Sequence, residues 1–196
     1  TACAAGSYRG SEGGTAQDDC TACPAGSACP SGATAPAACA PGTITASSGL
    51  STCSKCDAGT YQDAEGNTTC IDCPMGHHCG EGASAPLMCA AGSFRDTIGA
   101  TAQSDCTECP AGYACDEENG RETCVRCSPG SFKSGVGNRL CDECPVVPWQ
   151  AASTERDAAT SASECVCAVN YYDAGEVTNS SERVCEMCDV ERATCP

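Results

Sequence analysis

Hydrophobic residues along this chain do not recur with the period of a helix or of a strand. Instead, one large side chain follows a cysteine at a fixed distance of five residues, in the order Cys, two residues, Gly, Ser or Thr, large residue. A second cysteine follows 14 to 18 residues after the first. The pattern starts at Cys3, Cys39, Cys56, Cys89 and Cys127, and a degenerate copy with Asn170 in place of glycine starts at Cys167. Such a pattern predicts a tandem array of small loops.

Each loop is expected to have its own small core. The glycine permits a turn with positive φ directly after the cysteine. The large residue, which is Tyr8, Tyr61, Phe94 or Phe132 in four copies and Ile44 in a fifth, is then expected to fold back over the crosslink. A disulfide that closes a loop of this size contributes on the order of 3 kcal/mol in the loop-entropy account.

A second, smaller pattern alternates with the first. It is a seven-residue ring of the form Cys-Pro-x-Gly-x-x-Cys, and it runs from Cys23 to Cys29, from Cys73 to Cys79 and from Cys109 to Cys115. The ring follows a C-x-x-C sequence whose first cysteine closes the preceding large loop. The spacing therefore predicts that large loops and small rings follow one another along the chain.

Composition supports this class of protein. Cysteine makes up 23 of 196 residues, about 12 %, a level typical of disulfide scaffolds. Leu, Ile, Val and Phe together number only 17, too few to offset the entropy of ordering the chain without crosslinks. Disulfides at this density persist in oxidising compartments, so we expect a mature or excised piece of an extracellular or cell-surface protein.

Charge excludes two classes of partner. The net charge of −16 provides no basic surface for nucleic acid. It also disfavours anionic membranes, and no apolar run in the sequence is long enough for direct membrane insertion.

The cysteine spacing favours local, sequential disulfides over an interleaved scheme. The alternative joins Cys20 to Cys29 and Cys23 to Cys39, and it leaves the cysteines that close the larger loops without partners; spacing alone does not prove either connectivity. The sequential pairs are Cys3–Cys20, Cys23–Cys29, Cys39–Cys53, Cys56–Cys70, Cys73–Cys79, Cys89–Cys106, Cys109–Cys115, Cys127–Cys141, Cys144–Cys165 and Cys167–Cys185.

An odd number of cysteines leaves at least one without an internal partner. Cys124 is the first candidate for a free or intermolecular thiol, because the stretches before Cys39 and Cys89 contain no extra cysteine. Pairing of Cys115 with Cys124 is the alternative, and it frees Cys109. Near the end of the sequence, Cys188 pairs with Cys195 or either residue pairs outside this chain.

The alternation of C-x-x-G-[ST]-[FY] loops with C-x-x-C-P-x-G rings resembles the ephrin-receptor-like and tumour-necrosis-factor-receptor-like cysteine-rich repeats. These repeats are found in surface proteins of algae and protists, including mastigoneme proteins and surface antigens. The resemblance implies a small disulfide-rich fold, an elongated tandem array of modules with short β-hairpins and loops and almost no helix. Residues 144–172 resemble a variant in which a Pro/Ser/Thr-rich loop leads into C-x-C.

We interpret the array as four segments: 1–56, 56–109 and 109–144 with cysteine-rich repeats, and a divergent segment 144–196. The leading hypothesis is an extracellular structural protein, a glycosylated, disulfide-stapled rod that assembles with itself or with other extracellular glycoproteins into a surface coat or a mastigoneme-like filament. The alternative is a receptor ectodomain that binds a protein ligand, and a variable surface antigen is a third interpretation.

Neither catalysis nor a metal or other cofactor is expected. Cys53, Cys56, Cys70 and Cys73 have zinc-ribbon spacing, but tandem loops produce the same spacing. The C-x-x-C sequences lack the strand and helix context of thiol oxidoreductases.

The remaining polar groups also suggest no chemistry. His77 and His78 are adjacent, so we interpret them as an exposed loop tip, and the acidic run Asp116, Glu117 and Glu118 as a solvated face.

Two N-x-[ST] sequons, at Asn67 and Asn179, predict N-linked glycans in a secreted chain. Both lie in large loops shortly before the closing cysteine, which favours exposure. The Ser/Thr/Ala-rich stretches around 43–52 and 151–163 are compositional candidates for O-linked glycans.

Overall fold

A computed structural model gives the fold. It describes residues 2–10, 16–115, 121–137, 140–147, 152–154, 158–167, 171–176 and 183–187. The chain divides into two compact units, the first formed by Thr1–Cys89 with Arg95–Cys106 and the second by Ala90–Phe94 with Thr107–Pro196.

Both units are built almost entirely from two-stranded antiparallel hairpins. The helical elements of the described residues are three-residue 3₁₀ turns. This confirms the predicted small disulfide-rich fold with short hairpins and almost no helix. No described helix is long and apolar enough to cross a membrane.

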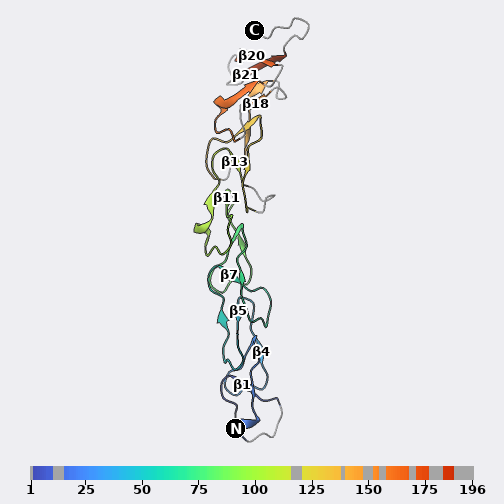
Figure 1. Ribbon diagram of the computed structural model, residues 1–196, viewed down its shortest axis with the longest axis vertical. Helices are drawn as coiled ribbons and strands as arrows, with labels where there is room; N and C mark the ends of the chain where they lie inside the picture. Colours follow the sequence, from blue (N-terminus) through green and yellow to red (C-terminus); the bar gives the residue numbers. More distant parts are fainter. Residues whose placement is uncertain are drawn as a thin grey trace. The chain divides into compact units, whose positions relative to one another are not determined.

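In the first unit the hairpins follow one another in chain order (Figure 1). They pair β1 with β2, β3 with β4, β5 with β6, β7 with β8 and β9 with β10. The elements are β1 (Ser7–Tyr8), η1 (Gln17–Asp19), β2 (Thr21–Ala22), β3 (Ser27–Ala28), β4 (Ala37–Ala38), β5 (Thr43–Ile44), β6 (Ser54–Lys55), β7 (Thr60–Tyr61), β8 (Ile71–Asp72), β9 (His77–His78), β10 (Leu87–Met88) and η2 (Gln103–Asp105).

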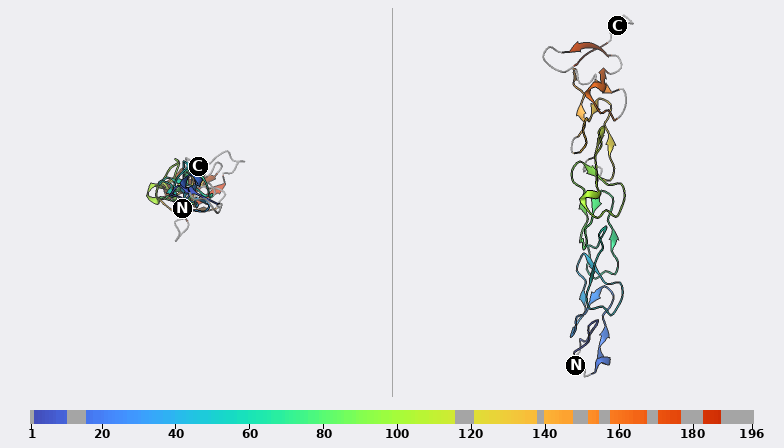
Figure 2. Two further views of the ribbon diagram at one scale, coloured as in Figure 1. Left: turned by 90° about the horizontal axis from the view of Figure 1, so that it is seen from below. Right: turned by 90° about the vertical axis from the view of Figure 1, so that its left-hand side faces the viewer.

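The second unit continues the series of short strands (Figure 2). It adds a three-stranded sheet in the order β17-β21-β20. In that sheet β17 runs parallel to β21, and β20 runs antiparallel to it. The elements are β11 (Ser93–Phe94), β12 (Thr107–Glu108), β13 (Tyr113–Ala114), β14 (Val125–Arg126), β15 (Ser131–Phe132), β16 (Asp142–Glu143), β17 (Val146–Val147), β18 (Ala152–Thr154), η4 (Ala162–Glu164), β19 (Cys165–Cys167), β20 (Tyr171–Glu176) and β21 (Arg183–Met187).

Each of the hairpins made of two-residue strands follows from the position of one glycine. Gly6 has φ +86°, a conformation that glycine adopts without steric cost, and it turns the chain directly after Cys3. The next two residues form the outgoing strand, and the two residues before the following motif form the return strand, so that Ser7 pairs with Ala22. Later glycines at the same place in the motif repeat this arrangement, with φ +80° at Gly26 and +83° at Gly42.

Cysteine, rather than the large side chain, forms most of the core. The first cysteine of each motif is almost completely buried, as Cys23 and Cys89 show with no exposed surface. The expectation that the large ring folds into a small core holds only in part: Phe132 packs against the buried cluster of Cys144, Cys165 and Cys185, whereas Tyr8 and Tyr61 lie half-exposed in their strands. A sheet of two short strands has too little area to cover a ring.

Candidate functional site

The described motifs are joined by a repeating ladder of backbone hydrogen bonds. The N–H of the first cysteine of a motif donates to the carbonyl of the turn glycine one motif earlier. The N···O distance is 2.9 Å from Cys23 to Gly6 and from Cys39 to Gly26. The second unit repeats the bond at 2.8 Å from Cys127 to Gly112. This ladder therefore uses main-chain groups and does not depend on the side chains between the cysteines.

A residue in the loop of a motif adds a second rung, and in the described motifs it is a glycine except at Ala158, whose N–H donates to Cys127 O at 3.2 Å. Gly49 N–H donates to Cys23 O at 2.8 Å, and Gly82 N–H donates to Cys56 O at 2.8 Å. Gly49 belongs to a large-loop motif, whereas Gly82 follows a small ring. The disulfides keep the two patterns that the sequence predicts, with small rings such as Cys23–Cys29 and large loops such as Cys39–Cys53. Both kinds of motif nevertheless occupy the same place in the ladder.

The sixth residue after the first cysteine explains how the two kinds of motif become equivalent. In small rings this residue is the ring-closing cysteine, such as Cys29. In large loops it is a polar residue that binds backbone groups: Thr45 Oγ1 donates to Ser27 O at 3.2 Å, and Gln62 Nε2 donates to Thr69 O at 2.7 Å. Sequence reasoning missed these anchors, although the position is polar in Arg9, Thr45, Gln62, Arg95 and Lys133.

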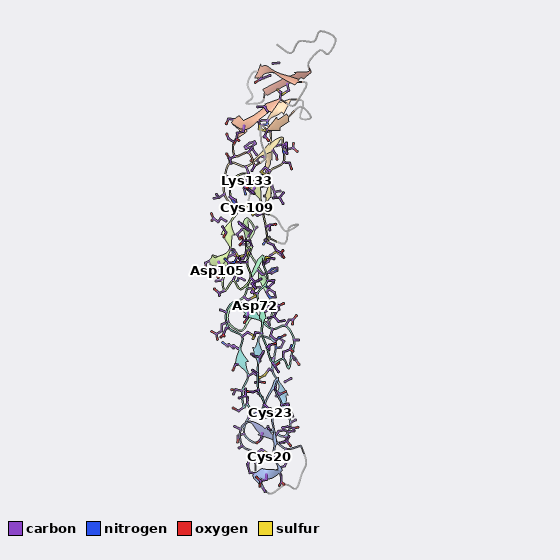
Figure 3. All side chains as sticks on the ribbon, in the orientation of Figure 1. Cys20, Cys23, Asp72, Asp105, Cys109 and Lys133 are labelled. Atoms are coloured by element: carbon purple, nitrogen blue, oxygen red, sulfur yellow. A yellow bond between two sulfur atoms is a disulfide. The ribbon has the colours of Figure 1, made fainter. Side chains whose placement is uncertain are left out.

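Lys133 is the most buried of these anchors. Its side chain has no exposed surface, and its Nζ donates to Tyr113 O at 2.8 Å and to Gly137 O at 2.9 Å. Burial lowers the pKa of the Lys133 amine from its ordinary value. Lys133 lies close to Cys109 in the second unit (Figure 3), because the Cys109 Sγ lies 3.2 Å from the same Tyr113 oxygen.

The structure joins the ten sequential cysteine pairs that the spacing favours. It joins neither pair of the interleaved scheme. The four cysteines with zinc-ribbon spacing are divided among the disulfides Cys39–Cys53, Cys56–Cys70 and Cys73–Cys79. The others are Cys3–Cys20, Cys23–Cys29, Cys89–Cys106, Cys109–Cys115, Cys127–Cys141, Cys144–Cys165 and Cys167–Cys185.

The odd cysteine lies in a cluster of three sulfur atoms. Cys109, Cys115 and Cys124 have their Sγ atoms within 4.8 Å of one another. The Cys115 sulfur lies against both of the others. The structure thus brings together the three residues between which the sequence left the odd thiol undecided.

The remaining predicted residues have simpler surroundings. His77 and His78 form strand β9, paired with Met88 and Leu87. The interpretation as an exposed loop tip was wrong, because both residues are half-buried in a hairpin. Cys188, Cys195, Asn179 and the run Asp116, Glu117 and Glu118 lie outside the described residues.

Asn67 is half-buried. Its Nδ2 donates to Gln62 Oε1 at 2.9 Å. Because an N-glycosylated amide keeps one N–H, this bond is compatible with a glycan at Asn67.

The fold and the ladder define a tandem cysteine-rich repeat protein stapled by disulfides. The profile of the tyrosine-protein kinase ephrin type A/B receptor-like family matches residues 42–86 and 112–165, just over half of the chain. The chain belongs to this family of cysteine-rich repeats, which are typically extracellular and have no associated catalysis. A search of curated proteins found no relative that matches the chain.

Proposed function

We propose that this chain is an extracellular structural protein whose repeats assemble, with further copies or with other extracellular glycoproteins, into a surface coat or a filament of the mastigoneme type. The observation that supports this role is the backbone ladder between motifs. Its rungs join main-chain groups of neighbouring motifs, so the array extends by repetition without requiring a particular side chain.

The disulfides suit a protein that resists unfolding outside the cell. Cysteines make up most of the buried apolar residues among those described. A crosslink of this loop length stabilises by on the order of 3 kcal/mol. A repeat held in this way withstands dilution, proteases and mechanical load better than one held by apolar packing alone.

The return strands provide a surface for lateral contacts. Leu87 and Met88 in β10 are 61 % and 43 % exposed, and the return strand β8 has exposed Ile71 next to Asp72. The side chains of the return strands thus differ in chemistry from one hairpin to the next, while the backbone of these strands stays the same. Such variation allows specific side-to-side contacts on a uniform scaffold.

Sedimentation velocity of the non-reduced, glycosylated chain over a hundredfold concentration range tests the proposal, with electron microscopy of the same sample. We expect concentration-dependent assembly into ordered fibres or sheets. Replacement of Leu87 and Met88 by Asp should weaken this assembly, whereas an Asp72→Asn control in β8 should not. A chain that remains a monomer at every concentration would contradict the structural role and direct the search to a protein ligand.

A further inference from the structure

Three cysteines of the second unit lie together, with the Cys115 sulfur against both Cys109 and Cys124. Among the described residues, every other cysteine belongs to one of nine separate disulfides. Cys109, Cys115 and Cys124 remain, with all three Sγ atoms within 4.8 Å of one another. A cysteine sulfur forms only one disulfide bond, so one of the three is a thiol whenever the other two are joined.

Cys115 is the central member of the cluster. Its Cα lies 5.8 Å from that of Cys109 and 4.4 Å from that of Cys124, and both separations lie within the range that disulfides span. The same backbone therefore accommodates either pairing. Whichever pair forms, the third sulfur stays close enough to attack it after a small side-chain movement.

The two outer cysteines differ in exposure. Cys109 has no exposed surface, and its Sγ is placed to donate an S–H bond to Tyr113 O at 3.2 Å. Cys124 is half-exposed and is followed by Val125, which is 51 % exposed. The odd thiol is therefore hidden when it resides on Cys109 and accessible when it resides on Cys124.

Lys133 favours the thiolate form of Cys109. Its Nζ and the Cys109 Sγ both contact Tyr113 O, at 2.8 Å and 3.2 Å, so the nitrogen and the sulfur are at most about 6 Å apart. At this distance an ammonium group stabilises a thiolate. Lys133 thus makes Cys109 a better leaving group than a buried thiol without a cation, and it raises the fraction of Cys109 that is present as thiolate for the reverse attack.

The neighbouring small-ring motifs lack this combination. At the place of Cys124 they have Pro36 and Pro86, each three residues before the next motif. At the place of Lys133 they have Thr45 and Arg95. Arg95 directs its Nη1 to Asp105 O at 2.9 Å, within its own loop. The extra cysteine and the buried lysine occur together only here, on either side of Cys127.

We propose that Cys109, Cys115 and Cys124 form a thiol–disulfide exchange site, in which the odd thiol moves between the buried Cys109 and the accessible Cys124, and that Cys124 is the position at which a low-molecular-weight disulfide modifies the chain. The site does not depend on whether the chain assembles.

The exchange needs no oxidant. The Cys124 thiolate attacks the Cys115 sulfur, the Cys115–Cys124 bond forms, the Cys109–Cys115 bond breaks, and Cys109 leaves as a thiolate beside Lys133. The reverse step regenerates the Cys124 thiolate. In the modification, this thiolate attacks glutathione disulfide, one glutathione becomes bonded to Cys124, and the other leaves as a thiolate.

Digestion with trypsin distinguishes chains that have the free thiol on Cys124 from chains that have it on Cys109. Trypsin cuts after Arg121 and Arg126 and releases residues 122–126, with Cys124 as the single cysteine of the peptide. The full, non-reduced chain is unfolded in excess N-ethylmaleimide and then digested. We expect peptide 122–126 partly as a free, labelled peptide and partly attached to the fragment that contains Cys115. If all of peptide 122–126 were found in only one of these two forms, the result would overturn the proposal.

Labelling of the native chain measures the exchange rate. We expect labelling of Cys124 in two phases. The fast phase comes from chains with the thiol on Cys124, and the slow phase comes from chains in which the thiol first moves from Cys109 to Cys124. Cys109 itself should carry no label. When the native chain is incubated with glutathione disulfide instead of N-ethylmaleimide, peptide 122–126 should gain one glutathione. Label on Cys109 in the native chain, or a peptide without glutathione, would contradict the proposal.

Substitutions at two positions, Cys109 and Lys133, separate exchange from simple exposure. Cys109→Ser fixes the Cys115–Cys124 bond, so peptide 122–126 should stay unlabelled; labelling in this variant would overturn the proposal. Lys133→Met should slow the slow phase by on the order of tenfold. Lys133→Arg, which keeps the charge at a place where the neighbouring motif has Arg95, should preserve it. An unchanged slow phase in Lys133→Met would show that the lysine has no part in the exchange.

Discussion

The turn at Gly26 packs directly against the carbonyl of Gly66, two motifs further along the chain. A Cβ atom at Gly26 would overlap the Gly66 oxygen. Gly42 has the same relation to Gly82. The turn glycine is therefore required twice, for a positive φ and for the close approach of a neighbouring loop.

Substitution of Gly26 tests the second requirement. Gly26 and Gly49 both have φ +80°, but a Cβ atom at Gly49 meets no atom within 4 Å. Gly49→Ala should cost about 1 to 2 kcal/mol, the penalty of a positive φ. Gly26→Ala should cost at least about 2 kcal/mol more, because backbone has to move. Guanidinium unfolding of the non-reduced variants measures both values, and equal losses would show that the approach of Gly66 contributes nothing.

The sequence predicted the local part of this fold well. Cysteine and glycine spacing indicated short hairpins, and Gly6 has the positive φ that its place in the motif requires. The contacts between motifs were missed, because a bond such as Gly49 N–H to Cys23 O joins main-chain groups and leaves no side-chain signature. The half-exposed state of Tyr8 was also missed, since the amino-acid type indicates a preference for burial but not whether a neighbouring layer exists to cover it.

The sulfur cluster was predicted only as an ambiguity. The sequence indicated that one of Cys109, Cys115 and Cys124 lacks a partner, but spacing does not report that all three sulfur atoms meet. The contribution of Lys133 required the fold, because its contact with Tyr113 O joins two motifs.

Loss of the Gln62 side chain should destabilise its loop. Gln62 Nε2 donates to Thr69 O at 2.7 Å, and Oε1 accepts from Ala64 N–H at 3.1 Å and from Asn67 Nδ2 at 2.9 Å. Gln62 is 3 % exposed, so Gln62→Leu leaves partly buried polar groups without partners and should cost about 1 to 3 kcal/mol. Gln62→Glu keeps the acceptor and should lose less. Proteolysis within residues 63–69 measures the local effect, and equal rates in wild type and Gln62→Leu would rule out an anchoring role.

Asp105 should make the stability of its loop depend on pH. Its Oδ2 accepts from the Thr101 N–H at 2.7 Å, from Thr101 Oγ1 at 2.8 Å and from the Ala102 N–H at 3.3 Å. The backbone hydrogen bond from Thr101, followed by that from its hydroxyl, holds the pKa of Asp105 below its ordinary value. A lowered pKa in the folded state stabilises the fold above the ordinary value of about 4, and this stabilisation is lost as the pH falls through the folded value.

Asp105→Asn should accordingly lower the thermal midpoint at pH 7, and its difference from wild type should shrink as the pH approaches 2. The exposed Asp96 in the same loop provides the control variant, Asp96→Asn. Thermal unfolding of the three non-reduced chains between pH 2 and pH 7 makes the comparison. A difference between wild type and Asp105→Asn that is the same at every pH would contradict the assigned hydrogen bonds.

The predicted N-glycan at Asn67 can be tested by substitution of the two threonines that follow it. Thr69 completes the sequon, whereas Thr68 occupies its variable position. In a secreting eukaryotic host, Thr69→Ala should remove one N-glycan mass from the chain, and Thr68→Ala should leave it in place. Both variants keep Gln62 and the Thr69 carbonyl that accepts its hydrogen bond, so a difference between them reports glycosylation rather than folding. If wild type and Thr69→Ala have the same mass increment after secretion, Asn67 is unmodified, and its Nδ2 serves the loop through Gln62 alone.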